Sequence, residues 1–248
     1  MSSRPHRLLM RVALFVTCLV DQLFPAVGEA TVSVLRRLGV DVQFPEGQTC
    51  CGQVAFNDGF WPEAARLAQK FIEDFDDSDA VVAPSGSCVA MVREFYPVLL
   101  RDESALADRV RALGRRTYEL SEFLVDVLHR EDVGAHFPHR VTYHASCHGL
   151  RGLHVTTQPL RLLAAVRGLE LRPLPGVEEC CGFGGMFSVK FAALSGSMLD
   201  AKIGAIESTG TEVVTATDSS CLMHIAGGLS RRNSPVRAMH LAEILAAQ

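Results

Sequence analysis

Short apolar runs alternate with longer amphipathic stretches along this chain. Runs typical of buried strands occur at residues 12–16, 40–44, 80–83, 141–144, 169–174, 212–216 and 236–239. Between them, apolar residues recur at helical spacing in residues 27–38, 62–75 and 192–207. Alternating strands and helices predict an α/β fold with mostly parallel sheets that helices cover.

The first apolar run could be a strand or part of a targeting segment. Arg4, His6 and Arg7 precede an apolar stretch at residues 12–20, as in a secretory signal. Against a signal, Arg11 interrupts the apolar sequence and no clean small-x-small cleavage site follows. The run is also far shorter than the roughly 20 residues that cross a bilayer. We therefore expect a buried first strand in a cytoplasmic protein without membrane insertion.

The composition and net charge bear on whether nucleic acid could be a partner. The chain of 248 residues is 48% hydrophobic and 21% charged, which is ordinary for a globular protein. Its formal net charge of −4 and its aromatic content of 7% give no reason to expect nucleic acid as a partner.

The cysteines divide into two matching quartets. Each quartet reads Cys, a gap, Cys-Cys-Gly, another gap, Cys, and equivalent cysteines lie about 130 residues apart. The first quartet is Cys18, Cys50, Cys51 and Cys88, and the second is Cys147, Cys180, Cys181 and Cys221. This repetition predicts an internal duplication.

Other residues repeat with the cysteines. Phe56 and Phe60 follow the first Cys-Cys-Gly as Phe187 and Phe191 follow the second. Near the end of each half, residues 120–124 resemble residues 241–245, which places about a dozen extra first-half residues within 95–115. We therefore predict two tandem Rossmann-like α/β units, one at 1–130 and one at 141–248, joined by a linker at 131–140.

The predicted strands place the cysteines at one edge of each sheet. Cys18, Cys88, Cys147 and Cys221 fall just past the carboxyl ends of predicted strands, and both Cys-Cys-Gly triplets fall in loops before helices. Parallel α/β sheets bind ligands at the carboxyl ends of their strands. The four cysteines of each half are therefore expected to converge.

Adjacent cysteines favour metal chemistry. A disulfide between neighbours strains the peptide, whereas two adjacent thiolates can bind different atoms of a multinuclear cluster. The following glycine lets the backbone turn tightly or approach a cluster. Four thiolates suit either a [4Fe–4S] cluster or a tetrahedral zinc ion, so the residues alone leave iron and zinc open for each half. A thiol–disulfide redox protein is a further alternative.

The repeated pattern resembles the cysteine-rich CCG domain family, whose members include one of the subunits of heterodisulfide reductase and the iron–sulfur subunit of glycolate oxidase. The chain is most similar to the lactate utilization branch of that family, in residues 15–21, 44–48, 84–88 and 180–185. The resemblance implies an iron–sulfur protein that acts with other subunits of a lactate-oxidising complex and with a redox partner protein to oxidise L-lactate to pyruvate.

The family's fullest pattern ends in Cys-x-x-Cys and holds a non-cubane cluster with five cysteines. Here Ser85 and Asp218 occupy the upstream positions. With four thiolates per half, we expect one cubane [4Fe–4S] cluster in each half.

Histidines gather around the second quartet. They are His144, His148, His154 and His224, and we single out His148 and His224 as possible additional ligands because they lie beside or near cysteines. The sequence contains no flavin or nicotinamide fingerprint and no defined acid/base pair. We therefore expect an electron-transfer subunit that does not catalyse lactate oxidation alone. The alternative is a zinc-binding scaffold or adaptor.

Overall fold

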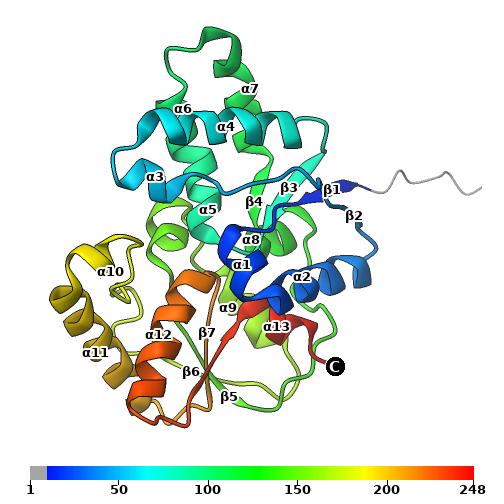
Figure 1. Ribbon diagram of the computed structural model, residues 1–248. Coiled ribbons are helices and arrows are strands. Elements are labelled where there is room, and N and C mark those ends of the chain that lie inside the picture. Colours follow the sequence, from blue (N-terminus) through cyan, green and yellow to red (C-terminus); the bar gives the residue numbers. More distant parts are fainter. Residues whose placement is uncertain (1–9) are drawn as a thin grey trace, which may run out of the picture.

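The computed structural model describes residues 10–248 and contains two four-stranded parallel sheets (Figure 1). Arg4, His6 and Arg7 lie outside the described residues. The first sheet has the order β2-β1-β3-β4, from β1 (Arg11–Leu14), β2 (Asp41–Gln43), β3 (Ala80–Ala83) and β4 (Thr117–Glu119). The second has the order β6-β5-β7-β8, from β5 (Arg140–Tyr143), β6 (Glu170–Arg172), β7 (Val213–Ala216) and β8 (Arg237–His240). The predicted duplicated α/β fold is confirmed.

Helices connect the strands in both halves. The first half contains α1 (Cys18–Leu23), α2 (Pro25–Arg37), α3 (Gln53–Asn57), α4 (Trp61–Phe75), α5 (Gly86–Ala90), η1 (Met91–Phe95), α6 (Tyr96–Leu99), α7 (Ser104–Arg115), α8 (Leu120–Glu122) and η2 (Phe123–Val127). The second contains η3 (His148–Gly152), α9 (Gln158–Ala165), α10 (Phe187–Lys190), α11 (Ala192–Ser208), α12 (Ser219–Arg231) and α13 (Leu241–Ala246). Within residues 10–248, no helix is both long and apolar enough to cross a membrane.

The expected extra residues of the first half form helices. α6 and α7 lie between η1 and β4, and the corresponding connection between α12 and β8 contains no helix. The helices of this insertion pack on α4, where Leu100, Val110 and Leu113 join a buried cluster with Phe71 and Tyr96. The insertion therefore adds helices to the outer layer of the first half.

Each sheet is buried on both faces, as expected for parallel strands. Along β1 and β3, Val12 and Val82 face one core whereas Ala13 and Val81 face another. The first of these cores also contains residues of the second sheet, such as Val141. The two sheets thus share one central core, and each sheet has a separate core on its outer face.

The halves interlock through their last helices. α13, at the end of the second half, packs on α2 of the first half, and the two lie side by side in Figure 1. Reciprocally, α8 and η2 of the first half pack on α9 of the second. Burial of apolar side chains from both halves in one core stabilises this arrangement.

The carboxyl edges of the two sheets meet at equivalent positions. Ser85 and Asp218 form an antiparallel bridge, and the Gly86 amide donates to the Thr217 carbonyl over 3.4 Å. Asp218 Oδ2 accepts from the Ser87 amide at 2.9 Å. A Cβ on Gly86 would lie 3.1 Å from the Gly149 backbone, so the close approach favours glycine here. The junction brings the cysteine-bearing loops of both halves together.

Candidate metal centre

Four of the cysteines lie directly after strands. Cys18 begins α1 after β1, and Cys88 lies in α5 after β3. In the second half, Cys147 precedes η3 after β5, and Cys221 lies in α12 after β7. These positions agree with the prediction that the cysteines follow the carboxyl ends of parallel strands.

Both Cys-Cys-Gly triplets form tight turns. The φ angles of Gly52 and Gly182 are +82° and +90°, in the left-handed region that favours glycine. Their amides donate to Cys50 Sγ and Cys180 Sγ, each over 3.4 Å. A Cβ on Gly182 would lie 2.6 Å from the Ser195 carbonyl oxygen. Glycine therefore permits the turn and supplies a donor that stabilises a thiolate.

The sulfurs of each quartet form a chain of contacts. The side chain of Cys50 interacts with those of Cys18 and Cys51, and the side chain of Cys51 interacts in turn with that of Cys88. The second quartet repeats the same order from Cys147 through Cys180 and Cys181 to Cys221. All eight cysteines are free thiols in the structure.

The hydrogen bonds select which thiol ionises first. The Cys18 thiol, and then the Cys51 thiol, hold the pKa of Cys50 well below its ordinary value, although burial opposes the shift. Cys147 and Cys181 act in the same way on Cys180. The pKa of Cys51 is raised instead, because its hydrogen bond to Cys50 favours the neutral thiol. Each half thus presents one ready thiolate in the doublet.

All eight cysteines line one cavity of about 180 Å³. The cavity lies at the junction of the halves, and Ser85, Ser87 and Asp218 also line it. Asp218 is fully engaged, because Oδ1 accepts from Ser220 and Oδ2 accepts from Ser85 and Ser87. The residues at the positions of the missing fifth cysteines therefore join the two halves.

The two histidines singled out from the sequence have different surroundings. His148 lines the cavity, with Nδ1 3.8 Å from Cys147 Sγ. His224 instead places Nε2 3.3 Å from Ser195 Oγ and packs against Phe183. Metal binding by the cysteines, and by His148 or His224 as additional ligands, stays a prediction.

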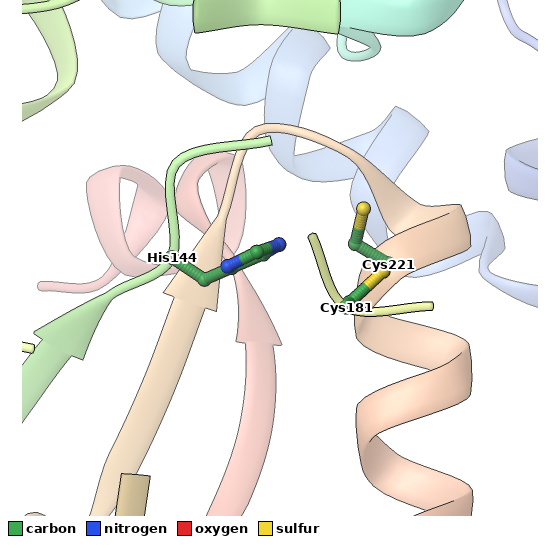
Figure 2. A group of neighbouring side chains, drawn as sticks. All are labelled: His144, Cys181 and Cys221. Carbon is green, nitrogen blue, oxygen red and sulfur yellow. The ribbon is translucent and has the colours of Figure 1, made fainter. Parts of the chain in front are cut away.

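His144 is the histidine that the structure places closest to two sulfurs at once. One of its ring nitrogens and the sulfurs of Cys181 and Cys221 lie within 4.8 Å of one another (Figure 2). The side chain is 1% exposed, and neither ring nitrogen has a hydrogen-bond partner. The sequence analysis noted His144 but did not single it out. Its signal lies in the duplication, because the residue three positions before Cys18 is Phe15 whereas the residue three positions before Cys147 is His144.

Comparison with known proteins identifies the family. The model of a cysteine-rich domain, CCG, matches residues 12–93 and 141–226, one match in each half. The chain is 50% identical to lactate utilization protein A of Bacillus subtilis and 49% identical to that of Bacillus licheniformis, over 95% of this chain and 99% of each relative. A solved structure of an aspartate racemase homologue from Pyrococcus horikoshii aligns over 96% of this chain and 96% of its own, at 12% identity. Its TM-score of 0.35 is too low to support any inference. The chain belongs to the cysteine-rich CCG domain family, among the relatives of lactate utilization protein A.

Proposed function

We propose that this chain is a cytoplasmic iron–sulfur electron carrier that works with partner subunits in the oxidation of L-lactate to pyruvate. The observation that carries the proposal is the convergence of two equivalent cysteine quartets on one cavity. The lactate assignment rests on relatives that share about half of their residues with this chain over nearly its whole length. Eight reduced cysteines suit a reducing compartment.

The spacing of the sulfurs favours a cluster over a single ion. A tetrahedral zinc ion with Zn–S bonds of about 2.3 Å holds its four sulfurs within roughly 3.8 Å of one another. Among the described residues, no three sulfurs of one quartet all lie within 4.8 Å of each other. The quartets are extended chains of thiols, which a multinuclear cluster can span. The group of His144, Cys181 and Cys221 is compact enough for one ion, so zinc in the second half is the alternative.

Two adjacent one-electron centres suit the reaction. Oxidation of lactate to pyruvate releases two electrons and two protons, and an iron–sulfur cluster bound by four thiolates in each half would accept one electron. The glycine amides at Gly52 and Gly182 stabilise thiolate charge in both halves. The described residues provide the ligands, while the partner subunits supply the chemistry on lactate and take up the protons.

The rim of the cavity offers a surface for a partner. Val54 lines the cavity and is half exposed. Nearby, Lys190 pairs with Asp58 over 2.9 Å, so the segments that carry Phe60 and Phe191 meet across the halves. Both phenylalanines are 58% exposed, so a partner that covers the rim could bury them. We assign this rim to a redox partner subunit.

Single-site variants test the proposal. Cys51→Ser and Cys181→Ser should each remove the iron of one half and reduce lactate-dependent electron transfer in the assembled complex at least tenfold. Ser230→Ala, exposed on the same helix as Cys221, is the control and should change neither. The proposal fails if both cysteine variants keep full metal content and full electron transfer.

A further inference from the structure

The walls behind the two quartets differ at two equivalent positions. Phe15 follows β1 where His144 follows β5. On the helix after each Cys-Cys-Gly, the buried positions repeat with the same spacing, which sets Lys202 of α11 at the position of Phe71 in α4. An aromatic pair in the first half is thus replaced by two nitrogen-bearing side chains in the second.

The wall of the first quartet is apolar. Phe15 and Phe71 pack edge to face with their ring centroids 4.9 Å apart, and Phe75 packs against both. The Tyr96 hydroxyl donates to the Cys51 carbonyl oxygen at 2.9 Å, which is a backbone acceptor and not a sulfur. These side chains present neither a cation nor a free N–H group to the sulfurs of this quartet.

The wall of the second quartet presents His144. The ring comes from the loop after β5 and points between Cys221 on α12 and Cys181 on its loop (Figure 2). Its nitrogens are buried without a partner, which costs free energy in an isolated protein. A thiolate of Cys181 or Cys221, or a sulfide of a cluster that they would hold, could accept a hydrogen bond from one of these nitrogens.

The wall of the second quartet also contains Lys202. This side chain is 1% exposed, and its Nζ donates to the Gly176 carbonyl oxygen at 2.6 Å. Burial lowers the pKa of Lys202, and the Glu179 carboxylate and the side chains of Cys181, Cys180 and Cys221 oppose that shift. A protonated Lys202 would add positive potential to the second half, where its equivalent, Phe71, carries no ionisable group.

Reduction adds one negative charge to an iron–sulfur centre, so nearby N–H donors and cations stabilise its reduced form. We propose that the second-half centre has the higher reduction potential and is the electron-accepting member of the pair, with His144 and Lys202 as the residues that raise it. The inference rests on the proposed function. Each electron from the lactate-oxidising partner would then pass from the centre held by the first quartet, which is reoxidised, to the centre held by the second, which is reduced, and would leave to the redox partner protein.

Single-centre variants assign the potentials to the two halves. Anaerobic potentiometric titration, followed by electron paramagnetic resonance, should give two one-electron transitions in the full chain. Cys181→Ser should retain the transition of lower potential, and Cys51→Ser the transition of higher potential. The reverse assignment would overturn the inference.

Wall variants test the two side chains even if a single-centre variant does not fold. His144→Phe, which copies the first half, and Lys202→Met should each shift the higher transition to lower potential and narrow the gap, with the iron content kept. Phe15→Leu removes an aromatic ring and adds no donor, so it should leave both transitions in place. Unchanged potentials in both His144→Phe and Lys202→Met would overturn the inference.

Iron analysis of the same samples separates this inference from the function on which it rests. Two transitions in the wrong order contradict only the assignment of the accepting half. A chain that holds zinc in the second half and shows one transition contradicts both the proposed pair of iron–sulfur centres and the direction of transfer between them.

Discussion

Glu119 and His240 occupy equivalent positions and respond to burial in opposite ways. Each ends the last strand of its half and begins the following helix with a capping box. Glu119 Oε2 accepts from the Ser121 amide at 2.8 Å, and His240 Nδ1 accepts from the Ala242 amide at 3.0 Å. Burial raises the pKa of Glu119 to about 8 and lowers the pKa of His240 to about 4.

Glu119 should make the stability of the protein fall as the pH rises. Its carboxyl binds a proton more tightly in the folded chain than at the ordinary pKa of 4.5, so its contribution is complete below pH 4.5 and is lost through pH 8. Relative to Glu119→Gln, the wild-type free energy of unfolding should decrease by on the order of 4 kcal/mol across this range. Denaturant titrations of both proteins at pH 5, 6, 7 and 8 measure the difference, and a constant difference would contradict the assignment.

His240 makes the free energy of unfolding depend on pH in the opposite direction. The effect of Glu119 must therefore be measured as a difference between the wild type and Glu119→Gln. The folded pKa of His240 lies below the ordinary 6.5, so its contribution is present above pH 6.5 and is lost as the pH falls toward 4. Between pH 4.5 and 6.5 the two residues partly cancel in the wild type. Both the wild type and Glu119→Gln contain His240, so the effect of His240 cancels when their free energies of unfolding are subtracted.

At the scale of elements, Arg37 of the first half binds the end of α13, the last helix of the second half. From the end of α2, its guanidinium donates to the carbonyl oxygens of Val133, Leu245 and Ala246, at distances of 2.7–3.1 Å. The last two of these carbonyls belong to the end of α13 and would otherwise lack a helical partner.

Arg37→Ala should therefore destabilise the protein by about 2 kcal/mol, because it leaves three carbonyl acceptors without their charged donor. The neighbouring Arg36 is exposed, so Arg36→Ala is the matched control and should change the free energy of unfolding by less than about 0.5 kcal/mol. Thermal and denaturant unfolding of the two variants decide the comparison. Equal effects of both substitutions would show that these contacts do not fasten α13.

Most strands could be predicted from the sequence because their apolar runs are continuous. β3 coincides with the run at residues 80–83, and β1, β5 and β7 lie within one residue of their predicted starts. β4, Thr117–Glu119, escaped prediction because three residues that include a glutamate form no apolar run. Pairing with β3 and the capping role of Glu119 hold this strand in place, and neither effect has an apolar pattern.

The convergence of the cysteines within each half could be predicted from the sequence, but the arrangement of the two quartets could not. The cysteine spacing and the strand ends place four sulfurs together in each half. The sharing of one cavity depends on the bridge between Ser85 and Asp218, which no periodicity indicates. The role of His144 depends on which way one side chain points at the end of β5, and this follows from tertiary packing.

For the whole molecule, one core couples the two halves. Val12 and Val82 of the first sheet and Val141 and Val213 of the second belong to the same buried cluster. The sequence boundary between units at residues 131–140 stays a prediction. The last helix of each half packs on the other half. If the chain were divided at this boundary, each half would therefore expose the apolar face that the other half's helix covers.

The shared core predicts a single cooperative unfolding transition. Trp61 is the only tryptophan and lies in the first half, so its fluorescence reports that half, whereas far-ultraviolet circular dichroism reports both. In anaerobic denaturant titrations the two signals should share one midpoint. Separate midpoints would show that the halves unfold independently and that the central core couples them weakly.

The central claim is that the two cysteine quartets hold iron–sulfur clusters side by side in one cavity. The most direct test is the content of iron, zinc and acid-labile sulfide per chain, with a visible spectrum, in protein purified without oxygen. The account predicts about eight irons and about eight sulfides with a broad brown absorbance, as two [4Fe–4S] clusters require. Stoichiometric zinc without sulfide or colour would contradict it and would identify the chain as a zinc-bound scaffold.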